Sequence, residues 1–320
     1  MKNILAKFWK SYSIGVVVVV VGIVLSFLTP RFISLDNLLN VMTNASLVAI
    51  MGLGMTLAIA SGNFDLSVGS TAALAGCVSF SLVPSIGVTA SIAAGLVVGA
   101  VVGLINGLII TELRVPAFIA TLGMMTIVRG AALIYTDGKD LYLFGQTEYK
   151  VLSGTYLFGI PTPILFAVGI SLLLGFIVSQ TRFGRHILAI GSNFLAAQRS
   201  GIPTSRVIWM IFSIVGATAA LSGMILSSQV LTANGRLATG IELSAIAVVV
   251  LGGTALSGGQ STMVGTLLGA LLISMVNNGL NLLNVPIFYQ ELTVGVLMLG
   301  ALAVNIGQGF DIRSILRRQA

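Results

Sequence analysis

Long apolar runs broken by short polar segments dominate the pattern of this chain. Seven stretches contain no Asp, Glu, Lys or Arg, namely 11–30, 37–64, 66–111, 151–181, 207–235, 243–290 and 292–310. A helix needs about 20 apolar residues to cross the hydrocarbon core of a bilayer. Two of these runs are long enough for two helices each, divided at 84–87 and at 258–261. The pattern predicts an all-α polytopic membrane protein with about ten transmembrane helices.

The predicted spans all combine sufficient length with high apolar content. They cover 13–28, 43–61, 66–82, 88–110, 116–135, 163–180, 207–228, 242–257, 263–282 and 290–307. The first span follows basic residues, as in a signal peptide, but lacks a small-x-small cleavage site, so we expect an uncleaved anchor. We expect one transmembrane domain over residues 1–320 and no soluble domain.

Basic residues fall into three blocks, which predict the orientation. They are Lys2, Lys7 and Lys10, then Arg182, Arg185, Arg199 and Arg206 beside His186, then Arg313, Arg317 and Arg318. Lys and Arg in short loops mark the cytoplasmic side. Six spans before the middle block and four after it place all three blocks on one side. We therefore predict cytoplasmic termini, a cytoplasmic loop at about 181–206 and an external loop at about 136–162.

Composition strengthens the membrane assignment. The chain is 56% apolar and 8% charged, with a mean hydropathy of +1.06, whereas soluble domains carry about 25% charged residues. So little charge cannot cover a water-facing surface of this size. The net charge of +7 could suggest nucleic acid, but the basic blocks have no interleaved aromatic residues and fit orientation signals instead.

Candidate catalytic chemistry is absent from the sequence. The single His186 and the single Cys77 lie on unlike segments and form no nucleophile–base pair. We interpret Cys77 as a packing residue. Acidic residues do not cluster at metal-ligand spacing, so we expect no cofactor, no metal and no enzymatic activity.

The segment 61–70, SGNFDLSVGS, places Asp65 between two apolar runs. An ionisable residue at membrane depth predicts a functional site, with Asn63 and Ser67 as polar neighbours on a translocation pathway. The other reading is an interhelical turn in which Asp65 caps the next helix, and the two readings weigh about evenly. A weak echo of Gly62-x-x-x-Leu66-Ser67-x-Gly69 recurs at 252–259, which is thin support for an internal repeat.

The string LSGGQ at 256–260 matches the signature of ABC ATPases. Such an ATPase also needs a phosphate loop, G-x-x-x-x-G-K-[ST], to hold the nucleotide. The only Gly-Lys pair, at 138–139, is followed by Asp140. We therefore predict that 256–260 is a glycine turn at the cytoplasmic edge between the eighth and ninth spans.

Two further polar segments carry hypotheses. The loop 181–206 is longer than a simple link requires, and Asn193 could cap a short helix, so a docking surface is favoured over a solvated loop. Four amides, Asn277, Asn278, Asn281 and Asn284, are spaced to share one helical face. They could bind helices together or meet the hydroxyls of a neutral polar solute.

Several ordered blocks together resemble the membrane permease subunits of bacterial ribose-type ABC importers. The blocks are 54–70, 115–130, 181–202, 242–273 and 277–283. The resemblance implies a type II-like ABC importer permease, a pore of two permease chains, and two cytoplasmic ATPases that use ATP. It also implies a periplasmic or lipid-anchored sugar-binding protein, and a location in the bacterial cytoplasmic (inner) membrane. A mild departure is Gly191-Ser192-Asn193 where the family typically has Gly-Gly-Asn.

The resemblance also implies residue roles. The expected ATPase-coupling residues are Arg182, Gly184, Arg185, Gly191, Asn193, Ala196, Ala197 and Gly201. The expected pathway residues are Asn63, Asp65, Ser67, Asn277, Asn278 and Asn281. We expect bulky replacements of Gly191 and Ala196 to uncouple transport from ATP hydrolysis.

The expected function is uptake of a monosaccharide, ribose or a similar pentose, by alternating access. Which sugar moves, and whether the dimer is homo- or heteromeric, cannot be read from the chain. The alternatives are an ion-coupled secondary transporter that uses Asp65 and a permease of the branched-chain amino acid type.

Overall fold

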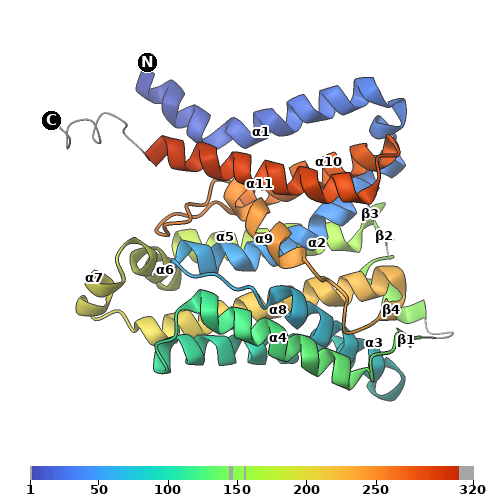
Figure 1. The fold of residues 1–320 in the computed structure, drawn as a ribbon, viewed down its shortest axis with the longest axis horizontal. Helices are drawn as coiled ribbons and strands as arrows, with labels where there is room; N and C mark the ends of the chain where they lie inside the picture. The colour runs from blue at the N-terminus through green and yellow to red at the C-terminus, as the bar shows by residue number, and fades with distance from the viewer. Residues whose placement is uncertain (1, 144–146, 155, 310–320) are drawn as a thin grey trace.

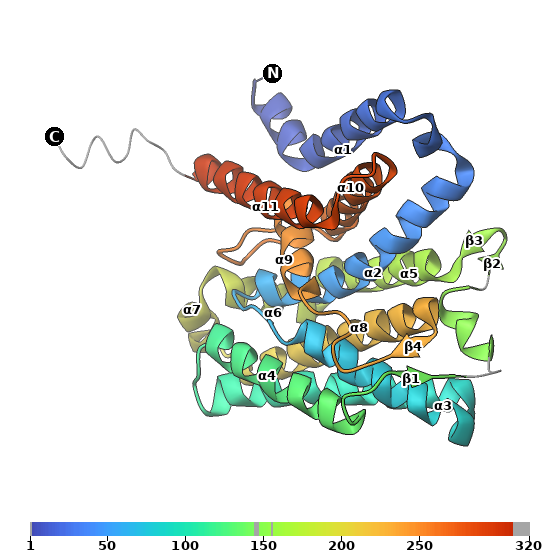
Figure 2. The same ribbon diagram turned by 45° about the vertical axis from the view of Figure 1, so that its right-hand side comes forward.

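The computed structural model describes residues 2–143, 147–154 and 156–309 as a bundle of helices lying roughly along one direction (Figures 1 and 2). The α-helices are α1 (Lys2–Leu28), α2 (Leu35–Ala60), α3 (Val68–Glu112), α4 (Ala117–Tyr135), α5 (Thr162–Gln180), α6 (Arg182–Ser192), α7 (Phe194–Arg199), α8 (Thr204–Val230), α9 (Ile241–Leu251), α10 (Met263–Leu282) and α11 (Ile287–Gly309). Two 3-10 helices are η1 (Pro30–Ile33) and η2 (Thr147–Leu152).

Four short strands lie at one end of the bundle. They are β1 (Leu141–Tyr142), β2 (Tyr156–Leu157), β3 (Ile160–Pro161) and β4 (Thr232–Ala233). β1 pairs with β4 and β2 with β3, both antiparallel. Figure 1 shows these strands at the end opposite α6 and α7.

Within the described residues, six helices are long and apolar enough to cross a membrane, namely α2, α3, α4, α5, α8 and α10. α3 is a folded-back pair of helices, because Gly87 has a non-helical φ of 77°. A Cβ atom on Gly95 would lie 3.2 Å from the carbonyl oxygen of Ala75, which a straight helix would hold about 30 Å away. The predicted division between 66–82 and 88–110 is therefore confirmed.

The helix predicted over 242–257 is wrong in length. α9 ends at Leu251, so its 11 residues span about 16 Å, roughly half a hydrocarbon core. Gly253 takes a left-handed φ of 86°, and Gly252 lies against Gly265 so closely that a Cβ atom on either would overlap the other backbone. The rest of the predicted span is the turn that leads into α10, and the count of ten spans remains a prediction.

The segments around the ends of α2 and α8 have related local geometry in opposite orientations. α2 ends beside α6, whereas α8 ends beside β4 at the other end of the bundle (Figure 1). Each helix is followed by a similar irregular segment, Asn-x-Asp-Leu-x-x-Gly at 63–69 and Asn-x-Arg-Leu-x-x-Gly at 234–240. Arg114 and Asn284, each followed by Val-Pro, adopt left-handed φ angles of 55° and 57°. This arrangement is typical of inverted repeats in transporters.

The internal echo expected between 62–69 and 252–259 is not the one that the fold displays. The segment 252–259 follows the short helix α9, whereas 63–69 follows the long helix α2. The counterpart of 63–69 by position and by sequence is 234–240. The shared glycines and Leu-Ser pair of the echo therefore arise from two different kinds of turn.

Glycines allow the closest helix contact in the bundle, between α3 and α8. A Cβ atom on Gly216 would overlap the carbonyl of Gly99, and one on Gly103 would overlap that of Phe212. Small residues let membrane helices approach until their backbones touch. α3 and α8 therefore form the most extensive helix pair of the bundle, against which α2 and α4 pack.

Tyr149 anchors the predicted external loop to α3 and α8. Its side chain is fully buried, its hydroxyl donates to Ser79 Oγ at 2.9 Å, and its carbonyl accepts from Ser228 Oγ at 2.7 Å. The ring of Phe80 meets it edge-on at 5.3 Å between centroids. Burial raises the pKa of the Tyr149 hydroxyl, so this anchor stays neutral at physiological pH.

Candidate functional site

The segment that follows α5 folds as two consecutive capped helices. Thr181 Oγ1 accepts from the backbone N–H of Gly184 at 3.2 Å at the start of α6. Asn193 Oδ1 accepts from the N–H of Ala196 at 2.9 Å at the start of α7. The predicted helix capped by Asn193 is confirmed, because a side-chain acceptor satisfies an N–H that the first turn cannot.

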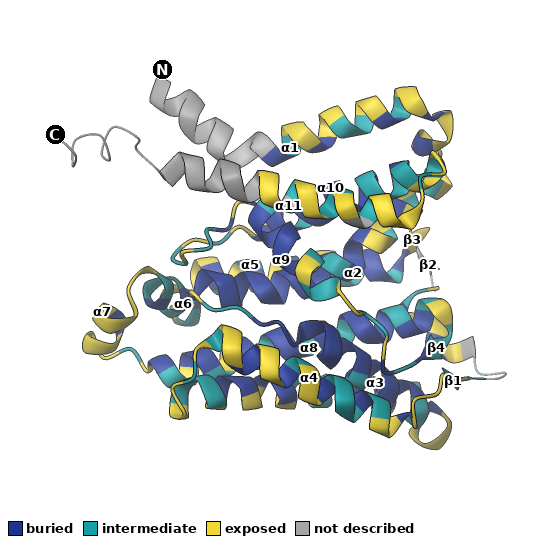
Figure 3. Cartoon of the chain, in the orientation of Figure 1, coloured by how far each residue is buried: buried dark blue, intermediate teal, exposed yellow. Residues whose placement is uncertain are grey.

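The tip of this segment exposes apolar side chains. Phe194 is 45% and Leu195 is 61% exposed, and Ala196 next to them is also exposed. Arg182 and Arg185 are exposed on α6. Figure 3 shows α7 as an exposed projection at the end of the bundle away from the strands. A short apolar projection flanked by cations has the composition of a protein-docking surface.

Four of the expected coupling residues instead support the local fold. Gly184 lies against the backbone of Val178, Ala197 is buried, and Gly201 has a left-handed φ of 80° after α7. Gly191, the fourth, is half-buried. The sequence motif did not separate these residues from the exposed ones. Phe194 was missed, although an apolar residue directly after a cap was a usable signal.

Gly191 is the centre of a three-way backbone contact. A Cβ atom there would overlap the carbonyl of Ala60, at the end of α2, and would lie 2.5 Å from the N–H of Gly259. Gly259 N–H in turn donates to the carbonyl of Ala60 at 2.9 Å. The LSGGQ string is therefore a turn, with φ of 80° and 78° at Gly258 and Gly259, and it packs on α6.

Asp65 forms a buried polar cluster at the start of α3. Its carboxylate Oδ1 accepts from Ser67 N–H at 2.8 Å and from Ser67 Oγ at 2.6 Å, and the residue is 1% exposed. Asn106, which sequence reasoning missed, donates to Ser67 Oγ at 2.8 Å. The Asn63 side-chain amide donates to the carbonyl and hydroxyl oxygens of Ser61, within the same turn. Asp65 thus closes a local turn immediately before α3, whose N-cap is Ser67 without a side-chain cap hydrogen bond. The expected helix cap by Asp65 is therefore not formed, and a pathway role for these residues remains a prediction.

The amides near the end of α10 lie in different surroundings. Asn278 and Asn37 exchange two hydrogen bonds, at 3.0 and 2.9 Å, which join α10 to α2. Asn277 Oδ1 is buried with no hydrogen-bond partner among the described residues, and Asn281 is exposed. The expected common face is wrong for Asn284, because α10 ends at Leu282 and Asn284 has a left-handed φ.

The two groups of expected pathway residues do not meet. One group lies beside the end of α2 and the other beside Asn37, near its start. The 23 residues between Asn37 and Ala60 extend about 35 Å along a helix. The structure therefore brings Asn63, Asp65 and Ser67 together with Asn106, and keeps Asn277, Asn278 and Asn281 apart from them.

Substitutions of Asp65 distinguish a structural role in the turn before α3 from a role in ion coupling. We expect Asp65→Asn to retain most uptake and stability, because its carbonyl oxygen can still accept from Ser67. Asp65→Ala should lower stability by about 1–3 kcal/mol, since it leaves a buried N–H and a hydroxyl without their acceptor. Thermal unfolding and solute uptake in proteoliposomes measure both effects. Loss of all uptake in a stable Asp65→Asn variant would contradict a purely structural role for Asp65.

These features define a polytopic membrane protein that holds an irregular polar segment inside a glycine-packed bundle and presents a small exposed apolar projection at one end. The family model described as "branched-chain amino acid transport system / permease component" matches residues 37–302. The chain belongs to this family of transport permeases.

Individual relatives extend the match over almost the whole chain. The ribose import permease protein RbsC of Escherichia coli (strain K12) is 40% identical over 306 residues, which cover 93% of this chain and 95% of the relative. RbsC of Bacillus subtilis (strain 168) is 42% identical over 285 residues, 88% of each chain. The L-arabinose transport system permease protein AraH of E. coli (strain K12) is 36% identical, covering 92% of this chain and 90% of the relative.

Proposed function

We propose that this chain is the membrane-spanning permease subunit of an ATP-driven importer for a monosaccharide, ribose or a similar pentose. The observation that carries the proposal is the 40% identity to a ribose import permease over 93% of the chain. Similarity to an L-arabinose transport permease supports the wider class of pentoses. The chain is a transport component, and ATP hydrolysis belongs to a separate cytoplasmic subunit.

The exposed apolar residues 194–196 of α7 supply the mechanical link to that ATPase. A push on α7 passes into α6, because the two helices share the residue Asn193 as C-cap and N-cap. From Gly191 it reaches the end of α2 and the turn at 258–259 through backbone contacts. Because these contacts join backbone atoms directly, no flexible side chain absorbs the displacement. A rigid-body shift of α6 and α7 can therefore reach the segment 61–67 and the start of α10.

A second permease chain completes the pathway in this proposal. On α4, Gly123 and Gly130 would place a Cβ atom in open space among the described residues, and the same holds for Gly295 on α11. Exposed Ile119 and Ile127 flank the glycines of α4. Membrane helices with small residues on an unpartnered face are suited to pack on another helix, so these faces support the dimer, homo- or heteromeric.

The same arrangement supports a proposed orientation in the membrane. Both described ends of the chain, α6 and α7 lie toward one end of the bundle in Figure 1, opposite the strands of 136–162. Basic residues favour the cytoplasm at that end. We infer that the chain is an inner-membrane protein with cytoplasmic termini and an external 136–162 loop, to which a periplasmic or lipid-anchored sugar-binding protein delivers the solute.

Reconstitution with and without the ATPase subunits tests the proposal. We expect proteoliposomes to accumulate labelled pentose only when ATPase, ATP and sugar-loaded binding protein are all present. A protonophore or a sodium ionophore should leave the rate unchanged. Accumulation that needs no ATPase and stops when the ion gradient is dissipated would establish the secondary transporter instead, and import of leucine but no pentose would establish the amino acid alternative.

A further inference from the structure

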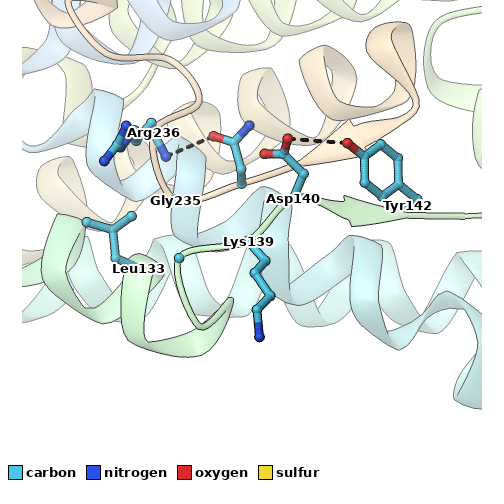
Figure 4. A pocket seen from close by; sticks show the side chains of 8 residues that line it. Leu133, Lys139, Asp140, Tyr142, Gly235 and Arg236 are labelled. Carbon is cyan, nitrogen blue, oxygen red and sulfur yellow. Dashed lines mark hydrogen bonds between the residues drawn. The ribbon is translucent and has the colours of Figure 1, made fainter.

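A polar pocket opens at the end of the bundle that carries the strands. Its volume is about 560 Å³, and its lining includes Asp140, Tyr142, Asn234 and Arg236 beside Leu133 and Gly138. Figure 4 shows Asp140 and Tyr142 on one side of the pocket and Arg236 on the other. This volume lies within the range of about 300–1,000 Å³ that is usual for small-molecule sites.

The two walls of the pocket are held together by backbone pairing. β1 pairs with β4 so that Leu141 lies opposite Ala233 and Tyr142 lies opposite Thr232. Asp140 precedes β1 and Asn234 follows β4, so both residues directly flank this pairing. The relative position of the walls is therefore fixed, although they are almost one hundred residues apart in sequence.

The wall at 234–236 is also fastened to α4. Arg129 Nη1 donates to the carbonyls of Gly235 and Leu237, both at 2.8 Å. Gly235 lies so close to α4 that a Cβ atom there would be 2.8 Å from the backbone nitrogen of Leu133. The Arg129 guanidinium thus positions this wall, and the glycine allows it to reach the helix.

Hydrogen-bonding groups of both kinds converge on the pocket. Asn234 Oδ1 accepts from the N–H of Arg236 at 2.9 Å, which orients its NH₂ as a donor. Asp140 accepts from the Tyr142 hydroxyl at 3.3 Å through one oxygen only. Lys139 also lines the pocket, and its ammonium group pairs with the exposed Asp137 at 2.6 Å. One carboxylate, one guanidinium, an amide and an aromatic ring suit a neutral molecule with several hydroxyl groups.

The segment that forms one wall of the pocket also continues into the bundle. The segment that begins at Asn234 continues inward to Glu242 at the start of α9, whose Oε2 is buried with no hydrogen-bond partner among the described residues. Gly69, in the first turn of α3, lies in contact with Glu242. A solute leaving the pocket along this segment would therefore reach the buried polar cluster of Asp65 and Asn106.

We propose that the pocket formed by 138–142 and 234–236 is an external subsite of the permease, which receives a monosaccharide before it moves inward. The proposal rests on the proposed sugar import and adds a site to it. A zwitterionic amino acid is the competing ligand chemistry, because Asp140 and Arg236 could each pair with one of its charges.

Isosteric variants of the complete transporter test this subsite. Asp140→Asn and Asn234→Ala are compared with Asp137→Asn, which removes a neighbouring exposed carboxylate outside the lining. The assembled transporter receives sugar-loaded binding protein, and both D-ribose import and ATP hydrolysis are measured. We expect ribose imported per ATP to fall at least fivefold in the two pocket variants, with hydrolysis within twofold of wild type. Asp137→Asn should match wild type.

Each other outcome has a defined meaning. Unchanged import in folded Asp140→Asn and Asn234→Ala variants overturns the subsite while leaving sugar import in place. An equal fall in import and in hydrolysis stimulated by the binding protein overturns it too, because the pocket is then a contact for that protein. Wild-type complex that imports leucine but no ribose, xylose or arabinose overturns both the subsite and the proposed function.

Discussion

Ala196→Trp is expected to reduce ATP-driven uptake at least tenfold without unfolding the permease. Ala196 is exposed on α7, so the indole ring extends into solvent, away from the described residues. If α7 docks on the ATPase as proposed, the same ring would lie within that interface, and close-packed interfaces tolerate such overpacking poorly. Uptake, ATP hydrolysis and co-purification of the ATPase should be measured together with thermal stability.

The control for this prediction is Ala93→Trp, an equally large change at an exposed position of α3. It should leave uptake within about twofold of wild type. The comparison with Gly191→Leu is also informative, since that change should lower the stability of the permease itself by overlap with Ala60. Normal uptake in a stable Ala196→Trp variant would remove α7 from the docking surface.

Gly216→Leu is expected to prevent the bundle from assembling. The leucine side chain has no space, because even a Cβ atom at this position overlaps the backbone of Gly99. Separating α3 from α8 would open the most extensive helix contact of the bundle and displace α2 and α4, which pack on this pair. Overpacking of a well-packed core costs about 1–3 kcal/mol where side chains can adjust, and here the obstacle is backbone. Yield of monodisperse protein and the unfolding midpoint in detergent measure the effect.

Gly169→Leu on α5 is the matched control for the glycine contact. A Cβ atom on Gly169 would meet no described atom within 4 Å, so the same substitution should leave yield and unfolding midpoint close to wild type. If Gly216→Leu were as stable as Gly169→Leu, the close contact of α3 with α8 would not be required for the bundle to assemble. Gly216→Ala should lie between the two.

Much of the membrane architecture could be predicted because its signals are local. Apolar run lengths located the six helices that can cross a membrane, and the break at 84–87 correctly divided α3. The cap at Asn193 and the glycine turn at 258–259 were likewise visible, since both depend on residues that are neighbours in sequence.

The candidate site could be predicted only as a region. The capped and partly exposed segment 181–206 was located correctly, but its packed glycines and its exposed face could not be told apart. Gly191 and Ala196 received one expected role, whereas the structure gives Gly191 a contact with Ala60 and Gly259, which are more than 65 residues away in either direction. Nothing within the segment encodes that contact.

The sequence by itself determined that this chain lies in a membrane, where its long helices run, and to which family of permeases it belongs. These properties follow from composition, from helix length and from ordered motifs. Only the tertiary structure decided that α9 is half-length, that Asn278 pairs with Asn37 at the opposite end of α2 from Asp65, and that Asp140 and Asn234 share a pocket. The physical reason is that each of these depends on which backbones approach one another, and glycine contacts between distant segments decide that approach.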